Sequence, residues 1–227
     1  MKNFLLSIAI FLLFSFKSFG HVEHYANFNY LEYELFRNNQ PIGYHKYDFK
    51  RDGNNLKIIS EVNFKITKLG VNLYKYFAKS EENYENAQFS SYTSKTKQNK
   101  KDRYVNIKTD QDKKNLIIDG SSYKGKADKD AIVGTWWNHE IVKAKAQISG
   151  ISGRIIDQKV TFIGKEEVKI GDKVYQTLRF NFKSSDKSLP DSKKLNTDIW
   201  YQEDTYLWIK AAFDKTGHWE YRLKIVK

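Results

Sequence analysis

Four consecutive residues, Trp136, Trp137, Asn138 and His139, form the densest group of side chains in this chain that could do chemistry. They combine two indoles, an amide and an imidazole, which would suit them to hold a glycan, an acyl chain or a partner protein if one side were open. The alternative interpretation is structural, with the indoles packed in the core and Asn138 capping a short helix. We take the four as candidate ligand-binding residues and keep both interpretations.

The two tryptophans also carry an expectation about direction. On a β-strand, successive side chains point to opposite faces of the sheet. If residues 136 and 137 lie on a strand, one indole packs into the main core and its neighbour projects the other way. The sequence leaves open which of the two faces the core.

Patterns that would indicate catalysis are weak or missing from the sequence. His139-Glu140 does not begin a zinc-protease motif, because Lys143 stands where the second histidine is needed. Neither a glycine-x-serine-x-glycine elbow nor a phosphate-binding glycine motif occurs. Paired-acid hydrolysis needs two carboxyls facing one cleft, whereas the acidic clusters are typical of turns and solvent-facing positions. These clusters are Glu81, Glu82 and Glu85, and Asp198, Glu203 and Asp204. The catalytic residues therefore remain unknown, and we predict no cofactor and no metal site.

Residues 1–20 have the features of a secretory signal peptide. Lys2 provides a basic start, an apolar run extends from Phe4 to Phe16, and Ser18-Phe19-Gly20 provides a small-x-small exit. The apolar run is shorter than the roughly 20 residues that a membrane-spanning helix needs. We therefore expect cleavage near Gly20 and a periplasmic or secreted protein. Residues 21–227 are expected to form a single β-rich domain.

Composition narrows the classes of partner. The chain has 39 Lys and Arg against 27 Asp and Glu, and it has no cysteine. Without cysteine, disulfides, a thiol nucleophile, a thiolate metal site and a lipoprotein anchor are excluded. A basic excess suits anionic surfaces, so peripheral contact with an anionic membrane is one predicted partner. Arginine, the side chain suited to bidentate contacts with bases, is scarce, and we predict no specific nucleic-acid binding.

Apolar and polar residues alternate along much of the chain after residue 20, which is typical of strands with one buried face. The clearest runs cover residues 31–35, 56–66, 178–182 and 219–225. Turn signals such as Asn38-Asn39 and Gly171-Asp172 lie between runs and favour hairpins. Helix is sparse, and the best candidate covers residues 138–147. We predict a mainly β protein with a single antiparallel, strongly curved sheet or open barrel and one or two short helices.

The order of several motifs carries a family resemblance. In the first half they are Asn39–Gly43, Leu73–Tyr76 and Glu82–Tyr84, and in the second half Trp136–Asn138, Gly164–Gly171 and Asp198–Tyr201. This order resembles a family of secreted bacterial proteins known as domain of unknown function 6134. The resemblance covers nearly all of the chain after residue 20. It implies an exported antiparallel β protein of unestablished activity, and it assigns no catalytic residue.

Two classes of function follow from these observations. The first is a non-catalytic periplasmic binding or envelope-associated protein whose apolar concavity accepts a lipid-like or other hydrophobic ligand. The second is a hydrolase acting on an envelope glycan or lipid. The missing catalytic motifs favour the first class.

Overall fold

The structure is a computed structural model, and it describes residues 25–112 and 114–227. The predicted signal peptide and its cleavage site lie outside the described residues. In the described part, no helix is both long and apolar enough to cross a membrane.

Fifteen strands form one sheet, with two 3-10 turns, η2 (His139–Val142) and η3 (Asp191–Lys193). In chain order the strands are β1 (Tyr30–Arg37), β2 (Gln40–Asp52), β3 (Asn55–Lys68), β4 (Val71–Glu85), β5 (Gln88–Gln98), β6 (Lys101–Thr109), β7 (Asn115–Gly120), β8 (Lys124–Asp128), β9 (Ile132–Val133), β10 (Ala146–Ile148), β11 (Ile155–Ile170), β12 (Lys173–Ser184), β13 (Asn196–Gln202), β14 (Trp208–Asp214) and β15 (His218–Val226). The predicted mainly β fold, a single curved sheet with short helical turns, is confirmed.

The order of strands in the sheet explains how the chain runs. From edge to edge it is β8-β7-β6-β5-β4-β3-β2-β1-β15-β14-β13-β12-β11-β10-β9. The first and last strands, β1 and β15, pair in the middle, and the chain runs outward to β8 and returns from β9. The pairs are antiparallel except β9 with β10, which is parallel.

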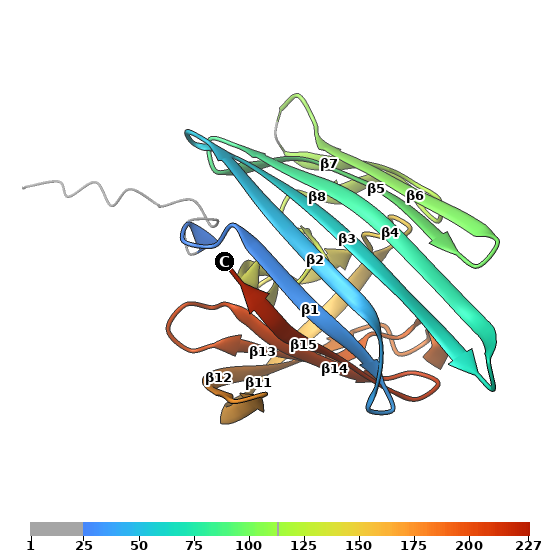
Figure 1. Ribbon diagram of the computed structural model, residues 1–227. Coiled ribbons are helices and arrows are strands. Elements are labelled where there is room, and N and C mark those ends of the chain that lie inside the picture. Colours follow the sequence, from blue (N-terminus) through green and yellow to red (C-terminus); the bar gives the residue numbers. More distant parts are fainter. Residues whose placement is uncertain (1–24, 113) are drawn as a thin grey trace, which may run out of the picture.

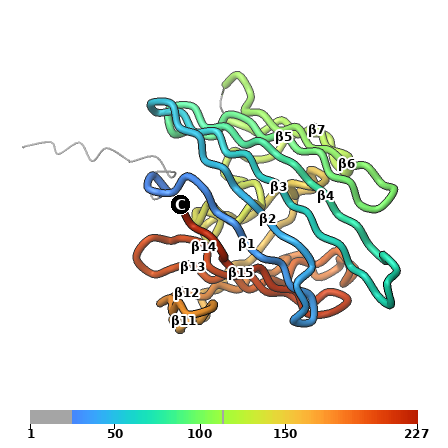
Figure 2. The backbone as a smooth tube through the Cα atoms, viewed as in Figure 1, coloured from blue at the N-terminus to red at the C-terminus, as the bar shows by residue number. Residues whose placement is uncertain are grey.

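The connection between the two edges forces the sheet to curl. β8 ends at Asp128 and β9 begins at Ile132, and four residues reach about 14 Å at most. Fifteen strands spaced about 4.8 Å apart would span roughly 65 Å if the sheet were flat. The sheet therefore bends until its edges approach, and its two halves face each other around a common interior (Figures 1 and 2).

Aromatic side chains fill this interior. Tyr33, Tyr47, Tyr201 and Trp208 are each at most 1% exposed. The ring of Tyr33 stacks on Trp208 at 4.0 Å between centroids, and its hydroxyl donates a hydrogen bond to the Trp208 carbonyl at 2.8 Å. The predicted alternation is confirmed in β1, where Leu31, Tyr33 and Leu35 are fully buried.

Residues 129–153, here called the inner segment, comprise the edge strands β9 and β10 with the turns around them, and they contact the other half of the sheet. The Tyr92 hydroxyl of β5 donates to the Gly150 carbonyl at 3.1 Å, and the Ser122 amide beyond β7 donates to Ser152 at 2.9 Å. Ile148 packs in a cluster with β6 and β7 residues such as Ile107 and Ile118. The inner segment therefore covers the concave face of β5–β7.

The helix predicted for residues 138–147 is wrong beyond its first turn. Only His139–Val142 is helical, and it is a 3-10 turn. Residues 146–148 are strand β10 and pair with β11, where Gln147 lies opposite Ile156. The Gln147 side chain donates to Gln158 at 2.6 Å in a buried position. Pairing with the long strand β11 thus overrides the local helical preference.

Candidate functional site

A cleft of about 1590 Å³ opens at one end of the sheet. The β2–β3, β4–β5 and β6–β7 turns line it, and the inner segment closes its base. Its apolar wall consists of Leu56, Phe89, Leu116, Ala131, Ile132 and Val133. Amides and hydroxyls around it belong to Asn54, Asn55, Asn86, Gln88, Ser90 and Ser91. The cleft therefore joins an apolar wall to a rim of hydrogen-bonding groups.

Glu82 of β4 lies at the base of this cleft and is only 3% exposed. One carboxylate oxygen accepts from the Tyr84 hydroxyl at 2.6 Å. The other accepts from the Trp137 indole nitrogen at 3.0 Å and the Thr135 hydroxyl at 3.4 Å. Burial raises the pKa of Glu82, and these three hydrogen bonds oppose the shift without cancelling it. A buried carboxyl with a raised pKa in a cleft is a candidate functional group.

Sequence reasoning placed Glu82 with the solvent-facing acids, and the structure corrects this. The alternation of β4 carried the signal, because Glu82 shares its parity with the buried residues Tyr76 and Tyr84. Its neighbour Glu81 points the other way and forms an ion pair with Lys57 at 3.0 Å. Glu82 could thus have been recognised from the sequence as an acid at a position that alternates in step with the apolar residues of its strand.

Trp137 is a core residue that also holds Glu82. Its side chain is fully buried and meets Tyr25, Phe49 and Tyr84 edge-on, with ring centroids 5.5 to 5.8 Å apart. Its indole nitrogen is satisfied by the Glu82 carboxylate. The structure therefore gives Trp137 a packing role beneath the cleft.

Trp136 does not alternate with Trp137. Residues 134–138 are not a strand, and Trp136 has a φ of +61°, in the left-handed region. Its indole meets Trp208 at 5.4 Å and Tyr221 at 5.6 Å, so both tryptophans pack against the same core. The expectation of opposite faces is wrong, because it assumed strand geometry that the left-handed residue breaks.

Asn138 caps η2, as predicted. Its side-chain oxygen accepts from the Glu140 amide at 3.1 Å. Its side-chain nitrogen donates to the Tyr84 hydroxyl at 3.4 Å, which links the cap to the Glu82 cluster. Asn138 is also part of the cleft lining, and it is the one of the four predicted site residues that lines the cleft.

His139 is directed away from this cluster. Its ring stacks on Tyr206 at 4.4 Å, and its Nε2 lies 3.1 Å from a Glu140 carboxylate oxygen. The cleft lining includes Asn138 and Glu140 of this region, and His139 is not part of it. The four predicted residues therefore divide into two core indoles, one cap at the cleft and one imidazole outside it.

A second titratable group, the partly buried His45 of β2, lies in the aromatic interior. Its Nε2 is 2.8 Å from the Ser60 hydroxyl, and its ring lies 4.3 Å from Tyr47. Burial lowers the pKa of His45 to about 3, so the imidazole is neutral at ordinary pH. Within the described ranges, its Nδ1 and the indole nitrogens of Trp136 and Trp208 have no hydrogen-bond partner.

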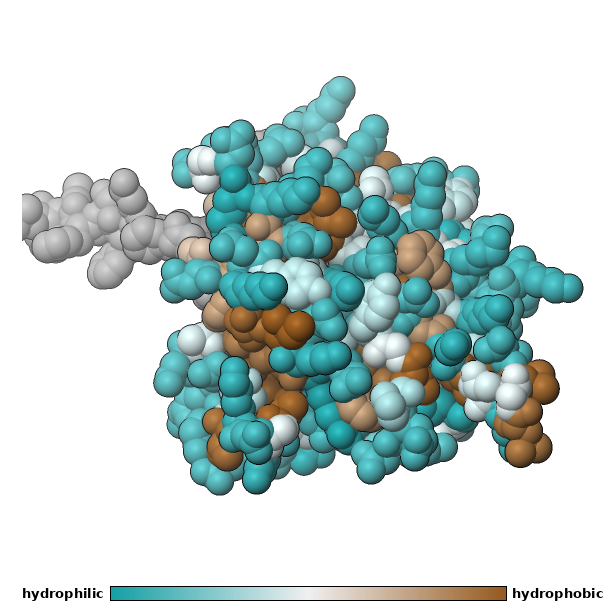
Figure 3. Space-filling view, viewed as in Figure 1, coloured by the Kyte–Doolittle hydropathy of each residue, from teal (hydrophilic) through white to brown (hydrophobic). Residues whose placement is uncertain are grey.

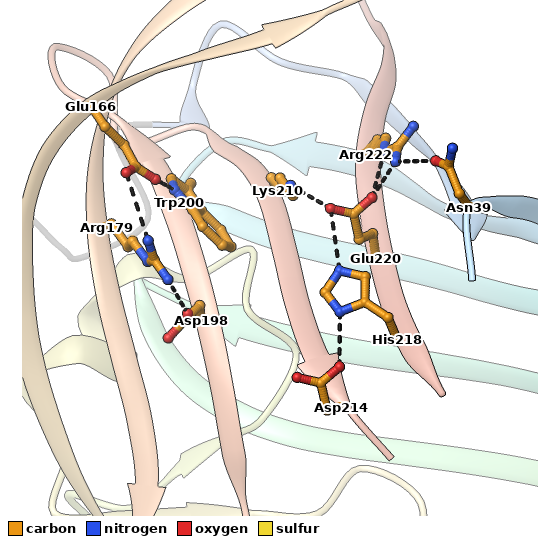
Figure 4. A network of polar contacts seen from close by, with 10 residues as sticks. All are labelled: Asn39, Glu166, Arg179, Asp198, Trp200, Lys210, Asp214, His218, Glu220 and Arg222. Atoms are coloured by element: carbon orange, nitrogen blue, oxygen red, sulfur yellow. Dashed lines mark hydrogen bonds and ion pairs between the residues drawn. The ribbon is translucent and has the colours of Figure 1, made fainter. Parts of the chain in front are cut away.

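A polar network covers the outer face of β11–β15 (Figure 4). The Arg179 guanidinium lies 4.9 Å and the Lys210 ammonium 5.1 Å from the Trp200 ring centroid. Glu220 forms ion pairs with both Lys210 and Arg222. Burial alone would raise the pKa of Glu220, but the hydrogen bonds from these two cations outweigh it and lower the pKa. The network joins neighbouring strands through their own side chains, and we interpret it as a structural clamp.

In the part of the chain that the structure describes, no group of three or more His, Asp or Glu side chains is placed so that it could hold a metal ion. The arrangement that remains for binding is the cleft, with its apolar wall, amide rim and buried carboxyl.

Comparison with known proteins identifies the fold and the family. No curated protein matches this chain. Among solved structures, a β-barrel-like protein of domain of unknown function DUF1849 from Brucella abortus superposes with a TM-score of 0.60. It is 12% identical, and the match covers 87% of this chain and 96% of that one. This likeness supports the curled-sheet fold alone. The family model of the domain of unknown function DUF6134 matches residues 33–224, and the chain therefore belongs to this family.

Proposed function

We propose that the protein is a non-catalytic binding protein whose cleft holds an amphipathic, lipid-like molecule. The observation that supports this most is the composition of the cleft, where one apolar wall meets a rim of amides and hydroxyls above a buried carboxyl. Binding sites for small molecules combine mostly apolar contact with a few fixed polar groups in this way. The expected export of the chain would place this activity outside the cytosol.

The apolar wall is rigid enough to bind without rearrangement. Leu116, Ala131 and Val133 are at most 7% exposed and belong to the core cluster that joins the inner segment to β6 and β7. Phe89 is partly exposed and packs edge-on against Tyr84 at 5.8 Å. A preformed wall lowers the entropy cost of binding. An apolar chain lying here would contact side chains that are already ordered.

The rim supplies partners for a polar headgroup. Besides its amides and hydroxyls, it carries the exposed lysines Lys108, Lys129 and Lys143 and the acids Asp110 and Asp130. Its charges are mixed, so we favour a headgroup that hydrogen-bonds through hydroxyls over a strongly charged one. The aromatic filling of the sheet interior supports the cleft, and not the centre of the sheet, as the ligand position.

Isothermal titration calorimetry tests this proposal with dodecyl maltoside as the probe, kept below its critical micelle concentration. We expect binding of dodecyl maltoside to exceed that of maltose or dodecanoate by about tenfold or more, since only the amphiphile uses both parts of the cleft. Ile132→Glu places a charge on the apolar wall and should remove most of the binding. Val174→Glu, at a site 56% exposed on β12, is the matched control and should bind normally. Equal binding by all three probes, or normal binding by Ile132→Glu, would contradict the proposal.

One observation favours the hydrolase as a second candidate, namely the raised pKa of Glu82 in a cleft. A general acid needs a proton that it can deliver to a substrate. Both Glu82 oxygens instead accept hydrogen bonds from side chains of the protein itself, which supports a positioning role. Product analysis by mass spectrometry after incubation with dodecyl maltoside separates the two. Turnover that disappears in Glu82→Gln would establish the hydrolase.

A further inference from the structure

The β3–β4 hairpin ends in an apolar tip that no other element covers. Leu69 is 94% exposed, Val71 62%, Leu73 56% and Phe77 42%. Figure 3 shows a brown, hydrophobic group at the corner of the molecule where the β3–β4 hairpin ends in Figure 1, next to hydrophilic surface. We call Leu69, Val71 and Leu73 the apolar tip; Phe77 lies further along β4, where it is opposite Lys97 of β5. Large contiguous apolar groups on a protein surface mark sites of interaction.

Strand registers show that the tip projects beyond the rest of the sheet. Pairing of β2 with β3 stops at Gly43 opposite Phe64, and pairing of β4 with β5 stops at Tyr76 opposite Gln98. Residues 65–74 therefore form a two-stranded ribbon that extends past both neighbouring strands, and the Lys75 backbone marks its base by its hydrogen bonds with Asn99 of the β5–β6 turn. Such ribbons are only marginally stable alone. This one places its most exposed leucine at its outermost turn.

The charge around the tip is predominantly positive. Between Val62 and Ser80 the sequence has four lysines and no acid. The adjacent β5–β6 hairpin, residues 94–103, has five basic residues and one acid. We call the basic residues of these two hairpins the basic collar, and they are Lys65, Lys68, Lys75, Lys79, Lys95, Lys97, Lys100, Lys101 and Arg103. In the described part of the chain, none of them forms an ion pair with an acid of this protein.

The lysines of the collar also face one another across strands. Lys65 lies opposite Lys75, and Lys79 lies opposite Lys95. Like charges directly opposite each other destabilise a sheet. A second apolar group on β11–β12, with Phe162 and Ile163 each 53% exposed, lies beside Lys165, Glu166 and Glu167 and so has mixed charge. Lys79 also has Glu61 opposite it on β3, and Lys97 has Asp102 opposite it on β6. Because residues 63–79 contain no acid, the excess of positive charge is still particular to the apolar tip.

We propose that the apolar tip inserts into an anionic lipid bilayer while the basic collar contacts the lipid headgroups. An exposed apolar group ringed by lysines has the two components that hold peripheral proteins on such surfaces, namely apolar insertion and attraction to negative charge. The lysine stems are long enough to lie along the acyl boundary with their ammonium groups among the phosphates. The proposal concerns the opposite end of the strands from the cleft and is independent of the proposed ligand.

Vesicle flotation with the protein lacking the predicted signal peptide, residues 21–227, tests the inference, because the apolar run at residues 4–16 could bind vesicles by itself. We expect binding to vesicles of phosphatidylcholine containing about one quarter phosphatidylglycerol, and none to phosphatidylcholine alone. Binding should weaken about tenfold or more when the salt rises from about 0.05 M to about 0.5 M, because salt screens the collar. Leu69→Asn should reduce binding about tenfold, and asparagine suits the φ of +50° at this position, so the fold is preserved. Ile163→Asn is the matched control and should bind as the wild type does.

A charge variant separates the two components. Lys68→Glu combined with Lys75→Glu should abolish binding to the anionic vesicles, and circular dichroism should confirm that the variant is folded. Unchanged binding by either variant would overturn the inference. So would equal binding to both vesicle types. Binding to duplex DNA that depends on the lysines but not on Leu69, without binding to vesicles, would instead identify a nucleic-acid surface and refute membrane insertion.

Discussion

Glu82 is buried and His45 partly buried on the concave side of the sheet, and loss of solvent shifts their pKa values so that each favours its neutral form. Burial raises the pKa of Glu82, so its unfolded carboxyl ionises first as pH rises, and the folded state loses stability between the two pKa values. His45 has the opposite dependence. Its pKa falls from 6.5 to about 3, so its contribution is complete above pH 6.5 and is lost as pH falls toward 3.

We therefore expect His45 to make the protein sensitive to mild acid. Between pH 6.5 and 4 its contribution to the free energy of unfolding should fall by up to about 1.4 kcal/mol per pH unit, the limit for one proton. His45→Gln keeps a polar contact for Ser60 but does not titrate, so its stability should decline less steeply. Urea unfolding at several pH values measures the slopes. Parallel slopes for wild type and His45→Gln would contradict this account.

At this scale the sequence identified part of the site. Asn138 was found because an amide before a short helical run is typical of a cap. Glu82 was missed because adjacent acids suggest a solvated surface, and only the strand parity separates it from Glu81. The direction of the Trp136 side chain depends on the left-handed backbone conformation of Trp136 itself, which the spacing of apolar residues in the sequence does not reveal.

Among the elements, the inner segment decides the shape of the cleft, because it forms the base and part of the apolar wall. Its position depends on a close approach of two backbones. A Cβ atom added at Gly120 would lie 2.6 Å from the Ser152 carbonyl oxygen, which is backbone and cannot rotate away. Glycine at residue 120 thus allows the inner segment to rest directly on β7.

Gly120→Ala should therefore destabilise the protein by about 1 to 3 kcal/mol, the usual cost of an overpacked contact. Urea unfolding measures the loss. The control is Lys126→Ala on the adjacent strand β8, where the side chain is exposed, and it should change stability by less than about 0.5 kcal/mol. A Gly120→Ala protein as stable as the wild type would show that the inner segment does not rest on β7 in this way.

The strands were the most predictable elements. A strand with one buried face alternates apolar and polar residues, and this pattern can be recognised when the strand is long enough. In β1 and β3 the apolar parity is the buried one. The hairpin turn at Asn38 and Asn39 was also readable, and both residues have the positive φ that tight hairpins need. The helix over residues 138–147 failed because β10 is only three residues long and exists through its pairing with β11. Sequence alone does not reveal such a partner.

The whole molecule has two different ends. Successive turns of an antiparallel meander lie at opposite ends of its strands, so the β2–β3 and β4–β5 turns line the cleft while the β3–β4 turn forms the apolar tip (Figure 1). A protein docked through the tip would hold its cleft away from the bilayer, open to the surrounding solution. The sequence predicted the curved sheet and the basic excess. It did not predict that the cleft and the apolar tip lie at opposite ends of the strands, because that arrangement depends on the registers between distant segments.

Hydrogen–deuterium exchange of the protein lacking the predicted signal peptide tests this two-ended arrangement most directly. It is measured on the protein alone, with dodecyl maltoside, and with phosphatidylglycerol-containing vesicles. We predict that dodecyl maltoside slows exchange in peptides covering residues 82–91 and 129–133, and that vesicles slow exchange in peptides covering residues 66–77. Each protection should leave the other end unchanged. Protection of the cleft by vesicles, or of the tip by dodecyl maltoside, would contradict the account.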